Sequence, residues 1–303
     1  MGYLYILIAV LSTTFKGYCG KTSSNMISMS RTGLGFSSIR MVFALAVGVA
    51  FVFIDQAPLS FSGELITVSL VSGISNAALI ISWLFCIRSG AFMLVDGIQA
   101  TMGIVLPTVA GLVFFNEIPR INEIIGIVLL IAASAVMCNY SGKIKGKLGA
   151  SGYILLLTTG CSAGLVFTCQ KWFAQSCPQI PASVYNLYSY FFATLFLGAF
   201  YMVFKLRRLP TSIPTEDKGA AQNIKNRLAL FAILMAVCMF FNTYFSTLAA
   251  GELPAARLYP VMQGLTTIFS VTMSSVIFKE RITITCAVGL ILNFGALMII
   301  NLL

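Results

Sequence analysis

Long apolar runs fill almost all of this 303-residue chain. Each run lasts about 18–25 residues, the length that a helix needs to cross a hydrocarbon layer about 30 Å thick. None shows the alternation of polar and apolar residues that a transmembrane β-barrel requires. With 58% hydrophobic and 9% charged residues, the composition also differs from that of a soluble domain. We therefore predict an all-α polytopic membrane protein with ten transmembrane helices, at 2–20, 36–54, 64–86, 90–115, 121–139, 151–170, 183–204, 228–249, 253–277 and 282–303.

The second half of the chain repeats the first. Residues 151–171, SGYILLLTTGCSAGLVFTCQK, align with residues 1–21, MGYLYILIAVLSTTFKGYCGK, and VFFNE at 113–117 matches VIFKE at 276–280. Because each repeat holds five helices, an odd number, the second copy enters the bilayer upside down relative to the first. We predict two inverted five-helix repeats, 1–145 and 146–303, in one membrane unit. This architecture is typical of transporters that alternate access to a site near the midplane, although a duplication retained only for packing is the alternative.

The basic residues predict how the chain is oriented. Fifteen Lys and Arg residues belong to loops after odd-numbered helices, whereas only Arg120, Lys171 and Arg257 belong to loops after even-numbered ones. Since positively charged loops stay in the cytoplasm, we expect the odd-numbered loops there and both termini outside, in a bacterial plasma membrane. The net charge of +10 is then a topology signal. Nucleic-acid binding would need a basic face on a soluble domain, so no nucleic-acid partner is expected.

The order of these features resembles the drug/metabolite transporter superfamily, in its ten-helix EamA-type branch. The resemblance is carried by the five-plus-five layout, Arg40 at the head of the second helix, FFNE and FKE before the fifth and tenth, and the closing GALMIINLL. Each half is also similar to the small multidrug resistance proteins. The resemblance implies secondary transport of small metabolites, amino acids or drugs through a central cavity, with the fifth and tenth helices at the edge.

Two departures from these relatives limit the inference. The membrane-embedded Glu of the small multidrug resistance proteins aligns with Thr13 here, so their coupling chemistry does not carry over. Ten-helix relatives have a basic loop after the second helix, whereas DQAPLSFSGE at 55–64 contains no Lys or Arg. We follow the charges of this chain in predicting its orientation.

Ionisable side chains inside the predicted helices are the leading substrate ligands, because they are costly in lipid unless they serve a cavity or a partner. Asp96 is the deepest acid and lies in the Gly- and Pro-containing stretch LVDGIQATMGIVLP; pairing with an Arg or helix capping is its alternative. Arg257 could bind a carboxylate, or reach a helix end, or pair with Glu252. Gln99 and Gln263 occupy nearly equivalent places in the two repeats. They could bind a small polar ligand, or they could form hydrogen bonds between helices.

Further polar residues complete the candidate substrate site. Tyr259 follows Arg257, and Lys16 could line the pathway or extend its ammonium to the interface. The remaining candidates are polar or aromatic residues on the third and eighth helices, namely Asn76, Trp83, Asn242 and Tyr244. Arg40 is interpreted as a charge at the boundary of the second helix, with a role as a ligand as the alternative. Glu117 and Glu280 are interpreted as structural acids near helix N-termini.

Several chemistries are not expected. The chain has no His and no CxxC pair among its eight Cys, of which Cys177 is predicted to be exposed. It also lacks a Gly-Lys-Ser phosphate loop. We expect no metal, cofactor or enzyme activity; a membrane-embedded transferase is a lower alternative. The expected function is secondary transport of an amino acid or similar zwitterion held by Asp96 and Arg257, with protons as a candidate coupling ion and a monomer as a sufficient unit. Export of organic cations or drugs is the alternative.

Overall fold

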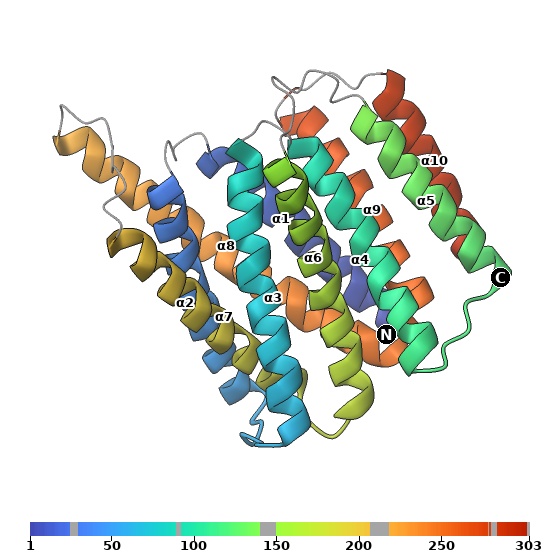
Figure 1. Cartoon of the computed structure of the whole chain (residues 1–303), viewed down its shortest axis with the longest axis horizontal. Helices are drawn as coiled ribbons and strands as arrows, with labels where there is room; N and C mark the ends of the chain where they lie inside the picture. Colours follow the sequence, from blue (N-terminus) through green and yellow to red (C-terminus); the bar gives the residue numbers. More distant parts are fainter. Residues whose placement is uncertain are drawn as a thin grey trace.

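The protein is described by a computed structural model that covers residues 1–24, 30–88, 92–139, 150–206, 218–277, 279 and 284–301. Within these residues the regular elements are ten α-helices, which confirms the all-α prediction (Figure 1). They are α1 (Gly2–Ser24), α2 (Ser30–Ile54), α3 (Gly63–Arg88), α4 (Phe92–Phe114), α5 (Ile121–Asn139), α6 (Ala150–Ser176), α7 (Ala182–Leu206), α8 (Lys218–Glu252), α9 (Ala255–Ile277) and α10 (Ile284–Asn301).

Eight of the described helices contain a stretch long and apolar enough to cross a membrane, and they are α2, α3, α4, α6, α7, α8, α9 and α10. The apolar part of α5, Ile121–Met137, is shorter, and α1 carries Lys16 and Lys21. The helices confirm a polytopic membrane protein, whereas membrane crossing by α1 and α5 stays a prediction.

Three helices extend well beyond their predicted limits. The second helix was expected to begin at residue 36 but begins at Ser30, and α8 begins at Lys218, ten residues before the predicted 228. The sixth continues to Ser176, past the predicted 170. Hydropathy marks the part of a helix that lies in hydrocarbon, whereas backbone hydrogen bonding continues through polar turns outside it. The apolar runs therefore underestimate helix length.

The helices of the first half interleave with those of the second. α1 packs along α8 and α3 along α6, while α2 packs on α7, α4 on α9 and α5 on α10. Each helix has a counterpart five places away in the chain. When every helix is replaced by its counterpart, the pair α1–α8 becomes α6–α3 and the other three pairs are each formed by two counterparts, so the set of pairs is unchanged. Figure 1 shows α5 and α10 side by side at one edge, and both chain termini toward the lower end of the bundle as drawn. The pairs have the symmetry expected of two related five-helix repeats, and the repeats and their inversion in a membrane stay predictions.

Two details of the backbone repeat as well. Asn116, after α4, and Lys279, after α9, are 163 residues apart and both have a φ of 52°, the left-handed conformation in which non-Gly residues are uncommon. Gly126 of α5 and Gly289 of α10 are also 163 residues apart. A Cβ at Gly126 would overlap Ile300, and one at Gly289 would overlap Met137, so each Gly permits the close contact between α5 and α10.

Candidate functional site

An ion pair between Glu117 and Lys171 lies where the α4–α5 turn meets the end of α6. Lys171 Nζ is 2.6 Å from Glu117 Oε1, and the two side chains are 2% and 17% exposed, respectively. The pair joins the first predicted repeat to the second. Because removing one partner of a buried pair leaves the other charge uncompensated, both residues are needed to hold these elements together.

Both members of this pair also bind the ends of neighbouring helices. Lys171 Nζ donates to the carbonyls of Ala250, at 3.1 Å, and Leu253, at 2.9 Å, where α8 ends. Glu117 Oε2 accepts a hydrogen bond of 2.8 Å from the N–H of Ala255, the first residue of α9. Carbonyls at a helix C-terminus favour a cation and N–H groups at an N-terminus favour an anion. The pair therefore holds the α8–α9 turn against α6 and the α4–α5 turn.

The turn after α4 makes room for the Glu117 carboxylate. With Asn116 in the left-handed conformation, the N–H of Glu117 donates to the carbonyl of Gly111 at 3.0 Å. A Cβ on Gly111 would lie 3.0 Å from Glu117 Oε2 and 3.2 Å from the Cβ of Ala255. A larger residue at Gly111 would therefore displace the carboxylate from α9.

Arg257, a predicted substrate ligand, is paired with Glu123 of α5. Its Nη2 and Nε each lie 3.2 Å from Glu123 Oε1. The other carboxylate oxygen accepts a 3.0 Å hydrogen bond from the N–H of Arg120, as residue N3 does in a capping box. Glu252, the partner considered from the sequence, instead lies 3.4 Å from the amino nitrogen of Met1. A substrate role for Arg257 stays a prediction, and it would require Glu123 to release the guanidinium.

Two other candidates on α9 lie at contacts with other helices. Tyr259 is fully buried, and its hydroxyl donates to the carbonyl of Phe167 in α6 at 2.7 Å. Gln263 lies over Gly103 of α4, because a Cβ at Gly103 would be 2.9 Å from Gln263 Nε2. Gln99 and Gln263 are both half-buried. Gln263 is thus at the contact between the counterpart helices α4 and α9, and the ligand roles of these three residues stay predictions.

The remaining candidates are spread over several helices. The backbone of Asp96 belongs to α4, but its side chain lies outside the described residues. Asn76 is buried in α3, and Trp83 packs on a small cluster that includes Val95 and Leu156. Their roles as ligands stay predictions.

Residues on α1 and α8 complete the set. The Tyr244 hydroxyl donates to Asp55 Oδ2 at 3.1 Å, which connects α8 to the end of α2. Lys16 is half-buried and close enough to Cys238 of α8 to interact with it electrostatically. Asn242 is half-buried. Their roles also stay predictions.

Two expectations about individual residues are wrong. Cys177 was expected to be exposed but is 6% exposed, because the turn between α6 and α7 packs it against apolar side chains such as Phe173 and Tyr185. Burial raises the pKa of its thiol, and the negative charge of Glu64 raises that pKa further. Arg40 was interpreted as a boundary charge but is 7% exposed. It lies ten residues inside α2, since α2 begins earlier than hydropathy indicated.

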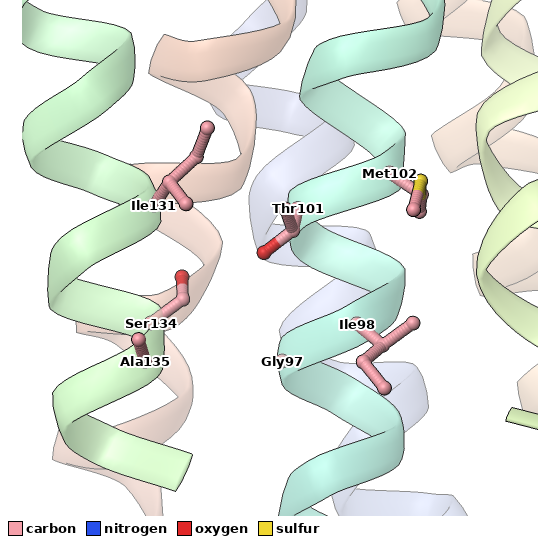
Figure 2. A pocket seen from close by; sticks show the side chains of 7 residues that line it. All are labelled: Gly97, Ile98, Thr101, Met102, Ile131, Ser134 and Ala135. Carbon is pink, nitrogen blue, oxygen red and sulfur yellow. The ribbon is translucent and has the colours of Figure 1, made fainter. Parts of the chain in front are cut away.

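Two grooves occupy related places in the two halves. One, of about 320 Å³, lies between α4 and α5, where Figure 2 shows Thr101 of α4 pointing toward α5 and Ile131 of α5 opposite it. The second, of about 300 Å³, lies between α9 and α10 and is lined by Ile268, Leu290, Ile291 and Phe294. Phe294 is 163 residues after Ile131, the same offset as in the turns and glycines. Both linings are mainly apolar, so neither groove suits a small polar ligand.

Comparison with protein families decides the identity of the fold. The model of the EamA-like transporter family matches residues 150–302, half of the chain. The chain belongs to the EamA-like transporter family. It is therefore a multi-pass membrane transporter of small solutes, as the sequence resemblance implied. The match covers the second predicted repeat, to which the first is related by sequence and packing.

A crystal structure of another protein shares the fold of this EamA-like transporter. The likeness covers 99% of this chain and 96% of the other, with a TM-score of 0.70 and 14% sequence identity. At that identity the similarity concerns the fold alone. A search of the curated proteins finds no match.

Sequence reasoning missed the polar partners that join the halves of this EamA-like transporter. Glu123 was not considered, and Lys171 was counted as a loop charge although its side chain is buried. A signal for Lys171 was present, because the repeat aligns it with Lys21 and the apolar run ends just before it. For Arg40 the signal was helical spacing, since Ser37, Arg40 and Ala44 lie on one face, and small residues on a membrane helix mark the side that packs on other helices.

Proposed function

We propose that this EamA-like protein is a secondary transporter that carries a small polar metabolite, with an amino acid or similar zwitterion favoured. In this proposal the two five-helix halves are inverted repeats that rock against each other and expose a shared site to each side in turn. The odd-numbered loops face the cytoplasm of a bacterial plasma membrane and both termini lie outside.

The observation that carries the proposal is the exchange symmetry of the helix pairs. Each helix of the first half packs on a helix of the second, and the pairs are preserved when counterparts are exchanged. In this proposal, exchanging the conformations of the two halves gives a second arrangement with related contacts, which alternating access requires.

Contacts between the halves at one end of the bundle support the proposal further. The pairs Glu117–Lys171 and Glu123–Arg257 each join a residue of the first half to one of the second. Both lie where α4, α6 and α8 end and where α5 and α9 begin. If the halves rock, these ion pairs close that end and must separate for it to open. The charge distribution predicts that this end faces outward.

Uptake into proteoliposomes tests the substrate class. The purified protein is reconstituted and offered radiolabelled neutral amino acids, quaternary amines and nucleotide sugars, each with and without a pH gradient. We expect saturable uptake of amino acids, and stimulation by the gradient if protons are the coupling ion. Protein-free liposomes are the control. Uptake of quaternary amines alone would favour the alternative, export of organic cations, and uptake of no solute would contradict the proposal.

Cross-linking tests alternating access. In a variant without native Cys, Glu117→Cys and Lys171→Cys are joined by a short reducible bifunctional reagent. Because the closed end must open in each cycle, we expect cross-linking to stop uptake and reductant to restore it. The same double-Cys variant treated with a monofunctional thiol reagent is the matched control, because each single-Cys variant would leave one buried charge without its partner. Full uptake by the cross-linked protein would contradict alternating access at this end.

A further inference from the structure

We infer that Arg40 of α2 binds the anionic group of the substrate, a carboxylate or a phosphate, between the two halves of the bundle. The inference rests on the proposed function, because it assigns a residue to the substrate site of the proposed transporter.

Arg40 lies on the buried face of α2, inside the membrane-spanning part of the helix. The membrane-spanning stretch is Gly33–Ile54, and Arg40 is about 10 Å from its start and about 21 Å from its end, at 1.5 Å per residue. The buried residues around it recur at helical spacing and are Leu34, Ser37, Met41 and Ala44. A guanidinium at this depth is costly unless an anion or polar groups compensate its charge.

Arg40 differs from Lys171 and Arg257 in having no carboxylate partner among the described residues. Lys171 has Glu117 and two carbonyls, and Arg257 has Glu123. Across the described ranges Arg40 has no ion pair, and its buried Nε has no hydrogen-bond partner. Since no described residue supplies the compensating anion, the guanidinium is available for an anion from outside the chain.

The surroundings of Arg40 belong to the opposite half of the bundle. Arg40 lies near Tyr190 of α7. The Tyr190 hydroxyl is 2.7 Å from Thr243 Oγ1 and donates to the carbonyl of Met239 at 3.0 Å, both in α8. Since α2 and α7 are counterpart helices in contact, an anion bound to Arg40 would lie at a contact between the two halves. Its binding would act on both halves at once.

The chemistry of the guanidinium selects the substrate class. Its planar N–H donors bind carboxylate or phosphate oxygens in pairs, and the apolar side chains nearby, such as Phe240, strengthen the attraction by lowering the local dielectric constant. The carboxylate of a zwitterion and the phosphate of a small phosphomonoester both fit. An organic cation without an oxyanion does not, because it would meet a buried positive charge.

Transport by three proteins tests the inference: the wild type, Arg40→Met and Arg40→Lys. Each protein is reconstituted and tested separately with three probes, which are an equimolar mixture of neutral amino acids, glycerol 3-phosphate, and tetraethylammonium. We expect the wild type to carry either the amino acids or glycerol 3-phosphate, which distinguishes the carboxylate from the phosphate. Because a hydrogen-bonded charge is lost, uptake should fall on the order of tenfold or more in Arg40→Met. Arg40→Lys should retain part of it with a raised KM.

A second measurement separates a ligand role from a structural one. The melting temperature of each protein in detergent, without substrate, should be unchanged or higher in Arg40→Met, and Arg257→Met serves as the paired-arginine control. A fall in Arg40→Met as large as in that control would overturn the inference, as would equal uptake by Arg40→Met and wild type or uptake of tetraethylammonium alone. No uptake of any probe by the wild type would overturn the proposed function and the inference with it.

Discussion

Buried cations have different surroundings at the end of the bundle, where α4, α6 and α8 end, and in its middle. At the end, Lys171 and Arg257 each have a carboxylate from the other half, Glu117 and Glu123. In the middle, Arg40 is more buried than Arg257 but has no carboxylate among the described residues. The difference teaches that burial alone does not identify a substrate ligand. A buried cation with a protein partner stabilises a conformation, whereas one without a partner has its charge available for a ligand.

The comparison is tested most strongly at the most buried ion pair. Lys171→Met leaves the Glu117 carboxylate without its cation and two carbonyls without a donor, so the free energy of unfolding should fall by about 3–5 kcal/mol. Denaturant titration in detergent micelles measures it. The double variant Lys171→Met with Glu117→Gln should recover part of the loss, since no unpaired charge remains. A loss below about 1 kcal/mol would be the value for an exposed ion pair and would contradict the role given to this end.

The two arginines provide the most direct contrast. Arg257→Met should lower the free energy of unfolding by about 1–3 kcal/mol, less than the full cost of a broken buried pair because the Arg257 side chain is 22% exposed. Arg40→Met should leave stability unchanged or increase it. The same melting assay in detergent compares them. Equal losses in both variants would remove the distinction between the middle and the end.

A glycine variant shows how a purely steric change, with no change of charge, affects stability and substrate preference. Gly126→Ala places a methyl group against Ile300 where α5 meets α10, so stability should fall by about 1–3 kcal/mol while substrate preference stays the same. Gly198→Ala is the matched control, because a Cβ there meets no atom within 4 Å. A change in substrate preference in Gly126→Ala would show that the edge helices contribute to selectivity.

The smallest effect is expected at Tyr190. Tyr190→Phe removes a buried hydroxyl that bonds to Met239 and Thr243, and the loss should be about 0.5–1.5 kcal/mol of stability. Since Tyr190 lies near Arg40, KM for the transported solute should also rise. Measuring uptake and melting on the same preparation distinguishes the two effects. An unchanged KM would place the hydroxyl outside the substrate site.

Much of the fold was predictable because hydrocarbon imposes strong constraints on sequence. A chain in lipid must satisfy its backbone within helices, so the apolar runs predicted all ten helices. The repeat predicted from the FNE and FKE turns stays a prediction, which the shared backbone conformation of Asn116 and Lys279 supports. Helix ends were less predictable, as Ser30 shows, because polar turns continue a helix without an apolar signal.

The candidate site was less predictable because its determinants are contacts between distant residues. Arg257 and Glu123 are 134 residues apart, so the sequence could present Arg257 as a free ligand while the fold gives it a partner. Arg40 was misplaced for the opposite reason, since its isolation is visible only once neighbouring helices are in place. Asp96 stays a prediction from sequence alone.

The contacts of Glu117 and Lys171 with helix ends give their ion pair a fixed polarity. Glu117 faces an N–H at the start of α9, while Lys171 faces carbonyl oxygens at the end of α8. Swapping the two side chains would keep the pair electrically neutral yet set an ammonium against a donor and a carboxylate against acceptors. The attraction between the two side chains would be the same in either arrangement, but the contacts with the backbone favour only the one observed. During evolution the two residues can therefore both become uncharged, but they cannot exchange places.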